Sequence, residues 1–194
     1  MKIVTISREY GAGGHSIGTK VAEKLGVEFY DKDIIMNVVK ESGYDKALVE
    51  ADNEEITPGQ SFIRAITPQY YDPKDEIYEC QKKAILELAA KGPCVILGRC
   101  ADIILAEAGY DALDVFIYAD SEHRKKRVGE LIESDDEAVI NKAIKKTDHN
   151  RHSYYSYYSG QHWGDYHNYE IMLDSGALGY EKCIEMICTA AKGE

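Results

Sequence analysis

The stretch IVTISREYGAGGHSIG, residues 3–18, sets the architecture that we expect for this chain. Its opening run, Ile3–Ile6, is rich in β-branched residues and predicts a buried strand. A glycine-rich turn follows, and apolar residues then recur at helical spacing, at Ile17, Val21, Ala22 and Leu25. A strand, a glycine loop and a helix N-terminus suit phosphate binding, because glycines let backbone N–H groups surround an anion and the helix dipole adds positive charge.

The loop departs from the P-loop pattern GxxxxGK[ST] at its main cation. Gly14 stands at the position where the pattern has lysine. Glycines precede it and Ser16 follows it. Two interpretations stay open: a phosphate-binding loop without its lysine, or a tight strand-to-helix connection whose glycines only allow close packing. In the first, Ser16 would ligate Mg²⁺. The residues expected to hold the phosphates of ATP are Gly11, Ala12, Gly13, Gly14, His15 and Ser16.

The composition is that of a globular protein. The chain has 194 residues, 44% hydrophobic and 29% charged, which is enough to bury a substantial core. Its formal net charge of −11 argues against sequence-independent binding to nucleic acid or to an anionic membrane. We expect no membrane span and no signal segment. The five cysteines form no CxxC pair, which favours reduced thiols in a cytoplasmic protein over a zinc site.

Strands and helices alternate along the rest of the chain. Short apolar runs predict further strands at residues 27–31, 94–97, 113–119 and 169–174, with helices between them. This alternation predicts an α/β fold with a parallel sheet flanked by helices, whose ligands bind beyond the carboxyl ends of the strands. We expect one domain over residues 1–194, with its core at 1–42, 75–120 and 168–194, a substrate-side insert at about 43–74 and a lid-like region at about 121–167.

A tract rich in tyrosine and histidine, residues 148–165, follows a charged helix that we expect at about 133–146. Tyrosine and tryptophan are favoured where a protein stacks on a base or sugar, and also at protein interfaces. The tract therefore predicts either a ligand-contacting surface or a homodimer interface. The alternative is an aromatic loop that packs on itself.

Several motifs together resemble the cytidylate kinase-like family, P-loop proteins related to bacterial cytidylate kinase. The resemblance extends over nearly the whole chain, and the stretches that carry it are residues 7–14, 29–31, 98–99, 119–124, the pair Asp148 and Arg151, 154–155 and 163–165. The resemblance implies a P-loop fold of the nucleoside-monophosphate-kinase type. It also implies that ATP with Mg²⁺ donates its terminal phosphate to a small-molecule nucleotide, with CMP as the first expectation.

The chain departs from cytidylate kinase at a few positions. That enzyme has the lysine at the position of Gly14 and a glycine or small residue at that of His15. It has an arginine at the position of Asn37, and the aspartate that follows its Gly-Arg pair is displaced by two residues here, to Asp102. These differences leave two further interpretations open: a nucleotide-binding regulatory protein without turnover, and a kinase for another small-molecule acceptor.

The resemblance assigns roles to individual side chains. Arg99 would clamp the acceptor phosphate, because a guanidinium can hold it with two hydrogen bonds, and arginines of the lid would close over the phosphates. Each arginine could instead form a structural ion pair. The catalytic candidates are Arg8, which could replace the missing lysine, with Arg99, Arg124, Arg127 and Arg151. The acceptor-binding candidates are Asp31, Arg99, Asp102, Asp148 and Arg151.

Overall fold

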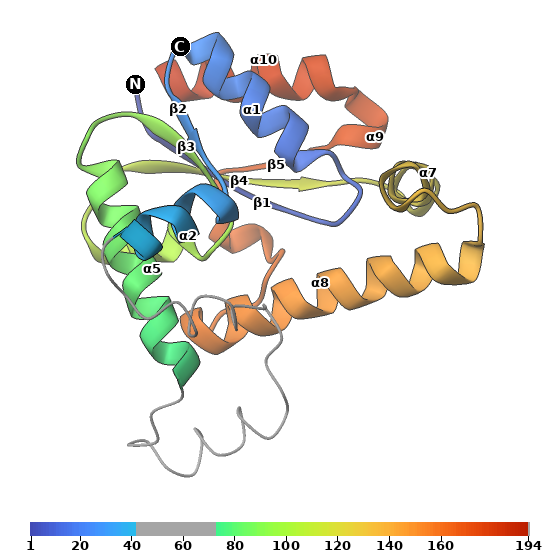
Figure 1. Ribbon diagram of the computed structural model, residues 1–194. Helices are drawn as coiled ribbons and strands as arrows, with labels where there is room; N and C mark the ends of the chain where they lie inside the picture. The colour runs from blue at the N-terminus through green and yellow to red at the C-terminus, as the bar shows by residue number, and fades with distance from the viewer. Residues whose placement is uncertain (42–72, 194) are drawn as a thin grey trace.

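The fold is built around a parallel sheet with helices on both faces (Figure 1). The structure is a computed structural model that describes residues 1–41 and 73–193. The described elements, in chain order, are β1 (Ile3–Arg8), α1 (Gly14–Leu25), β2 (Glu28–Tyr30), α2 (Lys32–Glu41), α5 (Pro73–Ala89), β3 (Cys94–Leu97), α6 (Ala101–Glu107), β4 (Ala112–Tyr118), α7 (Ser121–Ile132), α8 (Glu137–Ser159), η1 (Tyr166–Asn168), β5 (Ile171–Asp174), α9 (Ser175–Leu178) and α10 (Tyr180–Lys192).

The strand order within the described residues is β2-β3-β1-β4-β5, and every neighbouring pair is parallel. The central strand β1 pairs with β3 on one side, with Val4 opposite Val95, and with β4 on the other, with Val4 opposite Leu113. Parallel neighbours bring the carboxyl ends of all these strands to one edge of the sheet. The glycine loop that follows β1 therefore lies at the edge where ligands bind in folds of this type.

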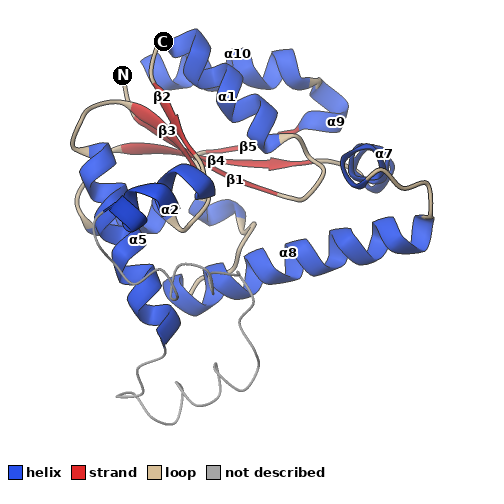
Figure 2. Cartoon of the chain, in the orientation of Figure 1, coloured by secondary structure: helices blue, strands red, loops and turns tan. Residues whose placement is uncertain are grey.

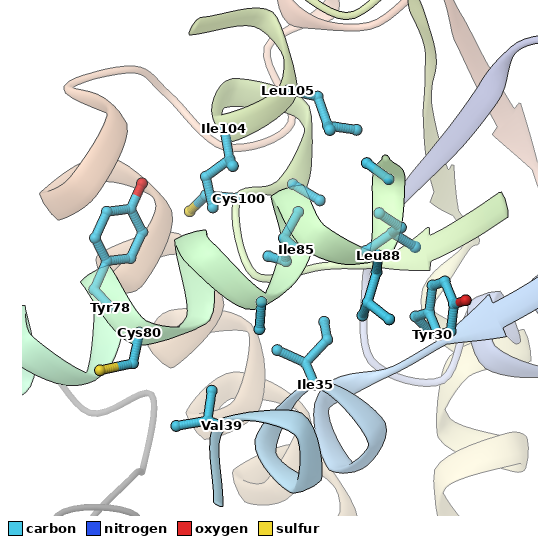
Figure 3. Packing of buried hydrophobic residues seen from close by; sticks show 14 of the residues in the cluster. Tyr30, Ile35, Val39, Tyr78, Cys80, Ile85, Leu88, Cys100, Ile104 and Leu105 are labelled. Carbon is cyan, nitrogen blue, oxygen red and sulfur yellow. The ribbon is translucent and has the colours of Figure 1, made fainter. Parts of the chain in front are cut away.

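Helices lie on both sides of the sheet (Figure 2), and a separate hydrophobic layer lies between the sheet and the helices on each side. On one face, α1 and α10 pack on buried side chains of β1, β3 and β4, among them Val4, Ile6 and Val115. On the other face, the buried residues come from α2, α5, α6 and α8, and Figure 3 shows Ile35, Ile85 and other members of this layer in contact. The burial of whole strands on both faces explains their nearly unbroken apolar runs.

The predicted α/β architecture is confirmed, with two adjustments of detail. The expected helix at about 133–146 is the first part of α8, which continues through the tyrosine tract to Ser159. Tyr154 and Tyr155 of that tract are buried in the core layer, and the Tyr158 ring stacks on Tyr78 with a centroid separation of 3.9 Å. This half of the tract thus packs inward. Of the predicted insert at about 43–74, all but the start of α5 lies outside the described residues.

One polar pair joins β1 and β4, with Thr5 buried and Asp114 half-buried. The Thr5 hydroxyl donates a hydrogen bond to Asp114 Oδ1 at 2.6 Å, and the Asp114 backbone N–H donates to the Glu170 carboxylate at 2.8 Å. Burial, aided by the nearby carboxylates of Asp102 and Glu170, raises the pKa of Asp114 to about 6. The folded protein therefore holds a proton on Asp114 over a pH range in which the unfolded chain has released it.

We expect Asp114→Asn to make the protein more stable above pH 6. Because the pKa of Asp114 is raised in the folded state, its unfavourable contribution grows as pH rises from about 4 to about 6 and then stays, up to ~3 kcal/mol. The amide keeps an acceptor for Thr5 and carries no charge. Urea unfolding of both proteins between pH 4.5 and 7.5 should show a difference that increases with pH. The exposed variant Asp135→Asn should show a flat difference, and a flat difference for Asp114→Asn would contradict the assignment.

Candidate functional site

The glycine loop between β1 and α1 adopts a shape that side chains would prevent. Gly11 and Gly13 have φ values of 87° and 78°, in the left-handed region that favours glycine. A Cβ at Gly11 would lie 2.8 Å from the Arg124 carbonyl oxygen, and one at Gly13 would overlap the Tyr180 hydroxyl. The loop thus packs closely against α7 and α10, so both interpretations of its glycines, tight packing and anion binding, remain compatible with its shape.

Helix α1 begins directly at the loop, and its first amide groups precede the hydrogen-bonded turns of the helix. The first intrahelical bond runs from the Ile17 N–H to the Gly13 carbonyl at 3.0 Å. The N–H groups of Gly14, His15 and Ser16 precede that bond, and the first turn of α1 carries no acidic residue. Ser16 stands two residues after Gly14, one residue further than the P-loop pattern places its hydroxyl after the lysine.

Arg124 and Asp148 hold the start of the loop in place. Arg124 Nε donates to the Tyr10 carbonyl at 2.8 Å, and its Nη1 lies 3.0 Å from Glu9 Oε1. Its Nη2 donates to Asp148 Oδ2, while Asp148 Oδ1 accepts the Tyr10 N–H at 2.7 Å. Burial raises the pKa of Glu9, and the positive charge of Arg124 opposes that shift. These four residues connect the end of β1 to α7 and α8.

Two further contacts fix the loop, through residues that were not predicted from the sequence. The buried Ser175 hydroxyl donates to the Ala12 carbonyl at 2.7 Å. Tyr180 lies against Gly13, as described above. Both residues come from the C-terminal part of the chain and belong to no recognisable motif. Only the run of glycines in the loop indicated that some neighbour had to approach it closely.

The loop opens into a cavity of about 380 Å³ at the carboxyl edge of the sheet. Its lining combines loop backbone with both positive and negative side chains. The lining residues are Arg8, Glu9, Tyr10, Gly11, Gly13, Gly14, His15, Ser16, Asp31, Lys32, Asp33, Leu97, Arg127, Leu131 and Arg151. A second cavity of about 410 Å³, lined by His123, Lys126, Glu130 and Tyr180, shares Ser16 and Arg127 with the first. The start of α1 therefore lies between these two cavities.

The structure brings most of the predicted phosphate-binding residues to this cavity, together with three of the predicted arginines. Arg151 Nη1 donates to the Arg8 carbonyl at 2.9 Å, and its guanidinium lies 5.7 Å from the centre of the Tyr10 ring. Arg127 pairs with Glu130 at 3.1 Å on the exposed side of α7. Ala12 is buried below the loop and does not line the cavity.

His15 and Asp31 lie together at one side of the cavity. His15 Nε2 is 3.3 Å from Asp31 Oδ2, and the His15 ring packs edge-on against Phe29. The other oxygen of Asp31, Oδ1, accepts the N–H groups of Asp33 and Ile34 at 3.1 Å and so caps α2. Asp31 therefore has a structural task at the helix N-terminus in addition to the acceptor-binding role predicted for it.

Arg99 and Asp102 lie apart from this cavity. Arg99 has a positive φ of 59° and is 4% exposed, with its Nη1 at 3.5 Å from Gln81 Oε1 and its guanidinium 5.3 Å from the centre of the Tyr154 ring. Asp102 is 5% exposed and accepts the Tyr155 hydroxyl at 2.8 Å, and burial raises its pKa. Neither residue is among those that line the cavity, and their predicted contacts with an acceptor remain predictions.

The residues present at the cavity suit a magnesium ion bound together with a nucleotide. Mg²⁺ usually takes one or two protein oxygens and fills its other positions with phosphate oxygens and water. The Ser16 hydroxyl and the carboxylates of Asp31 and Asp33 line the same cavity and can supply such oxygens. Among the described residues there is no group of three or more histidine, cysteine, aspartate or glutamate side chains that could hold a metal without a nucleotide.

The parallel sheet, the glycine loop at its central strand and the cavity at the carboxyl edge define a P-loop fold of the kinase type. The family comparison agrees with this class. Residues 3–177 match the model of the cytidylate kinase-like family, so the chain belongs to that family. The family and the fold support phosphoryl transfer in general.

Solved structures extend the comparison of folds. An uncharacterized protein from Eubacterium ventriosum is 26% identical, with a TM-score of 0.77 and complete coverage of both chains. Shikimate kinase from Bacteroides thetaiotaomicron is 12% identical over 98% of each chain, with a TM-score of 0.54. The YorR protein from Bacillus subtilis, solved with phosphorylated GDP, is 13% identical over 98% of this chain and 96% of its own, with a TM-score of 0.53. No curated protein matches the sequence.

None of the described helices is both long enough and apolar enough to cross a lipid bilayer.

We expect Arg124→Met to destabilise the protein by ~2–4 kcal/mol. The change leaves two partly buried carboxylates without their shared cation, and breaking such a pair costs more than the pair itself contributes. Urea unfolding at pH 7.5 measures the loss. The matched variant Arg127→Met removes a guanidinium that pairs on the surface of the same helix and should cost less than ~1 kcal/mol. Equal losses in the two variants would show that the loop does not depend on Arg124.

Proposed function

We propose that the protein transfers the terminal phosphate of ATP to a nucleoside monophosphate, with CMP as the first candidate acceptor. The observation that carries the proposal is the cavity at the glycine loop. It combines the first residues of α1, Gly14, His15 and Ser16, with Arg8, Arg127 and Arg151 in a chain whose formal net charge is −11. Phosphoryl transfer needs mainly positioning and neutralisation of charge, and both amides and arginines serve those needs.

Each part of the site has a task in this proposal. The loop amides around Gly13 would hold the β-phosphate of the donor, and the Ser16 hydroxyl would hold Mg²⁺, which would supply positive charge to the phosphates. Arg127 and Arg151 approach the phosphates from α7 and α8, the segments predicted to form the lid. The second cavity beyond Ser16 and Arg127 offers space for the remainder of a nucleotide.

The acceptor is assigned on family membership alone. Asp31 and Arg151 line the cavity and can reach an acceptor there. Asp148 stabilises the loop, whereas Arg99 and Asp102 are buried behind it, and a role for them in acceptor binding requires that part of the site to rearrange. Asn37, which replaces an arginine of cytidylate kinase, favours an altered acceptor pocket and so keeps another small molecule open as the acceptor.

We further propose that the protein works in the cytoplasm. The five cysteines are buried and none of them forms a disulfide, which suits a reducing compartment. A homodimer remains a proposal as well. It would have to use exposed residues beside the tyrosine and histidine tract, such as Tyr166, which is 70% exposed, because Tyr154 and Tyr155 are buried in the core. Sedimentation of the purified protein tests this point.

A second candidate function is nucleotide binding without turnover. Gly14, at the position of the lysine that binds the terminal phosphates in P-loop proteins, is the observation that favours it. The two candidates differ in one measurable respect. A regulatory protein binds ATP and leaves it intact, whereas a kinase consumes ATP only when its acceptor is present.

An assay with ATP and Mg²⁺ against a panel of nucleoside monophosphates tests the proposed function. We expect acceptor-dependent formation of ADP, greatest with CMP, and a loss of at least tenfold in Ser16→Ala because the metal loses its protein oxygen. Arg99→Ala tests whether the buried arginine contributes to acceptor use. The variant Ser121→Ala, which removes an exposed hydroxyl at the start of α7, serves as the control. ATP binding without transfer to any member of the panel would favour the regulatory protein or a different acceptor.

A further inference from the structure

Because the lysine is missing, another side chain must supply positive charge to the terminal phosphates if ATP binds here. In P-loop proteins the lysine reaches the β- and γ-phosphates from the first turn of the helix. Among the residues that the structure describes, the cations at this cavity are Arg8, Lys32, Arg127 and Arg151, with His15 beside Asp31. Arg127 and Arg151 come from α7 and α8, and His15 is turned toward the carboxylate of Asp31. Only Arg8 comes from β1, directly below the loop.

The side chain of Arg8 crosses the position where the lysine would begin. A Cβ placed on Gly14 would lie 2.7 Å from both Cβ and Cγ of Arg8. The aliphatic part of Arg8 therefore runs against the bare Cα of Gly14, in the first turn of α1. Gly14 has an ordinary helical conformation, so its lack of a side chain serves this contact and not a special backbone geometry.

A second glycine receives the charged end of the same side chain. Gly98 follows β3, the neighbour of β1, and its N–H donates to the Ile6 carbonyl at 3.0 Å. A Cβ on Gly98 would overlap Nη1 of Arg8. The guanidinium thus lies at the carboxyl edge between β1 and β3, beside the cavity that the loop amides also line. Arg8 is further fixed at its backbone by the hydrogen bond from Arg151 to its carbonyl.

We propose that Arg8 supplies from β1 the positive charge for the terminal phosphates of ATP that P-loop proteins supply from the position of Gly14. Gly14 and Gly98 are the two positions whose missing side chains let Arg8 reach that place. A lysine at residue 14 and Arg8 in this conformation exclude each other sterically. The inference rests on the proposed function, since it assumes that the loop binds a triphosphate.

Variants of Arg8 separate its charge from its packing. Arg8→Met keeps an unbranched stem over Gly14 and removes the charge, whereas Arg8→Lys keeps the charge. Isothermal titration with ATP and Mg²⁺, and with inorganic triphosphate, should show a loss of about ten- to hundredfold in affinity for Arg8→Met, as expected for a charged hydrogen bond. We expect a smaller loss for Arg8→Lys. The control Lys182→Ala removes one exposed positive charge on α10 and should bind both ligands as the natural protein does.

A second set of variants moves the positive charge from residue 8 to residue 14 and so tests whether Arg8 and a lysine at residue 14 exclude each other. Gly14→Lys alone should fail to gain affinity, because Arg8 occupies the space. The double variant Arg8→Ala with Gly14→Lys should bind ATP to within a fewfold of the natural protein and better than Arg8→Met. Circular dichroism and thermal unfolding confirm that each variant is folded before its affinity is compared.

The outcomes distinguish this inference from the function on which it rests. A natural protein that binds neither ATP nor triphosphate contradicts both. Undiminished ATP affinity in folded Arg8→Met contradicts only the role of Arg8. So does a folded Gly14→Lys protein that gains affinity while Arg8 is present, or a folded double variant that binds no better than Arg8→Met.

Discussion

The guanidinium of Arg124 is the group on which the shape of the glycine loop depends. It joins the Tyr10 carbonyl and the carboxylates of Glu9 and Asp148, and so ties the end of β1 to α7 and α8. Because these charges are partly buried, each of them would be costly without the others. These interactions constrain the conformation of the loop, and such preorganisation lowers the cost of binding a ligand. A side chain expected to act on phosphates is therefore used in this structure to shape the site.

The fold could be predicted largely because its signals are local. The apolar run at Cys94–Leu97 and the glycines after Ile6 need no distant partner to be recognised, and alternation of such runs with helical periods defines the class of sheet. The extent of α8 could not be read in the same way. Tyr154, Tyr155 and Tyr158 share the inward side of that helix, but their aromatic character suggested a binding surface, and only the packing on α5 shows where they lie.

The candidate site was predicted only in part, because some of its contacts join residues that are far apart in the sequence. The loop itself carries a recognisable pattern, so its glycines and Ser16 were found. Nothing in the sequence indicates that Asp148 accepts a hydrogen bond from Tyr10, or that Ser175 holds the carbonyl of Ala12, because these partners are more than a hundred residues apart. The position of Arg99 after a central strand indicated a role at the site but not its surroundings: the residue is 4% exposed beside Tyr154, and its contact with an acceptor stays a prediction.

A net charge of −11 says little about phosphate affinity, because binding depends on where a few arginines lie. Arg124 is neutralised by two carboxylates below the loop, and Arg99 is enclosed in the core layer. Arg8 differs from both because two glycines make room for it along the edge of the cavity. A glycine that replaces a lysine would ordinarily be counted as a loss of function. Here Gly14 leaves room for the side chain of Arg8 to approach the loop. Gly14 and Arg8 are therefore best understood as one feature of the site.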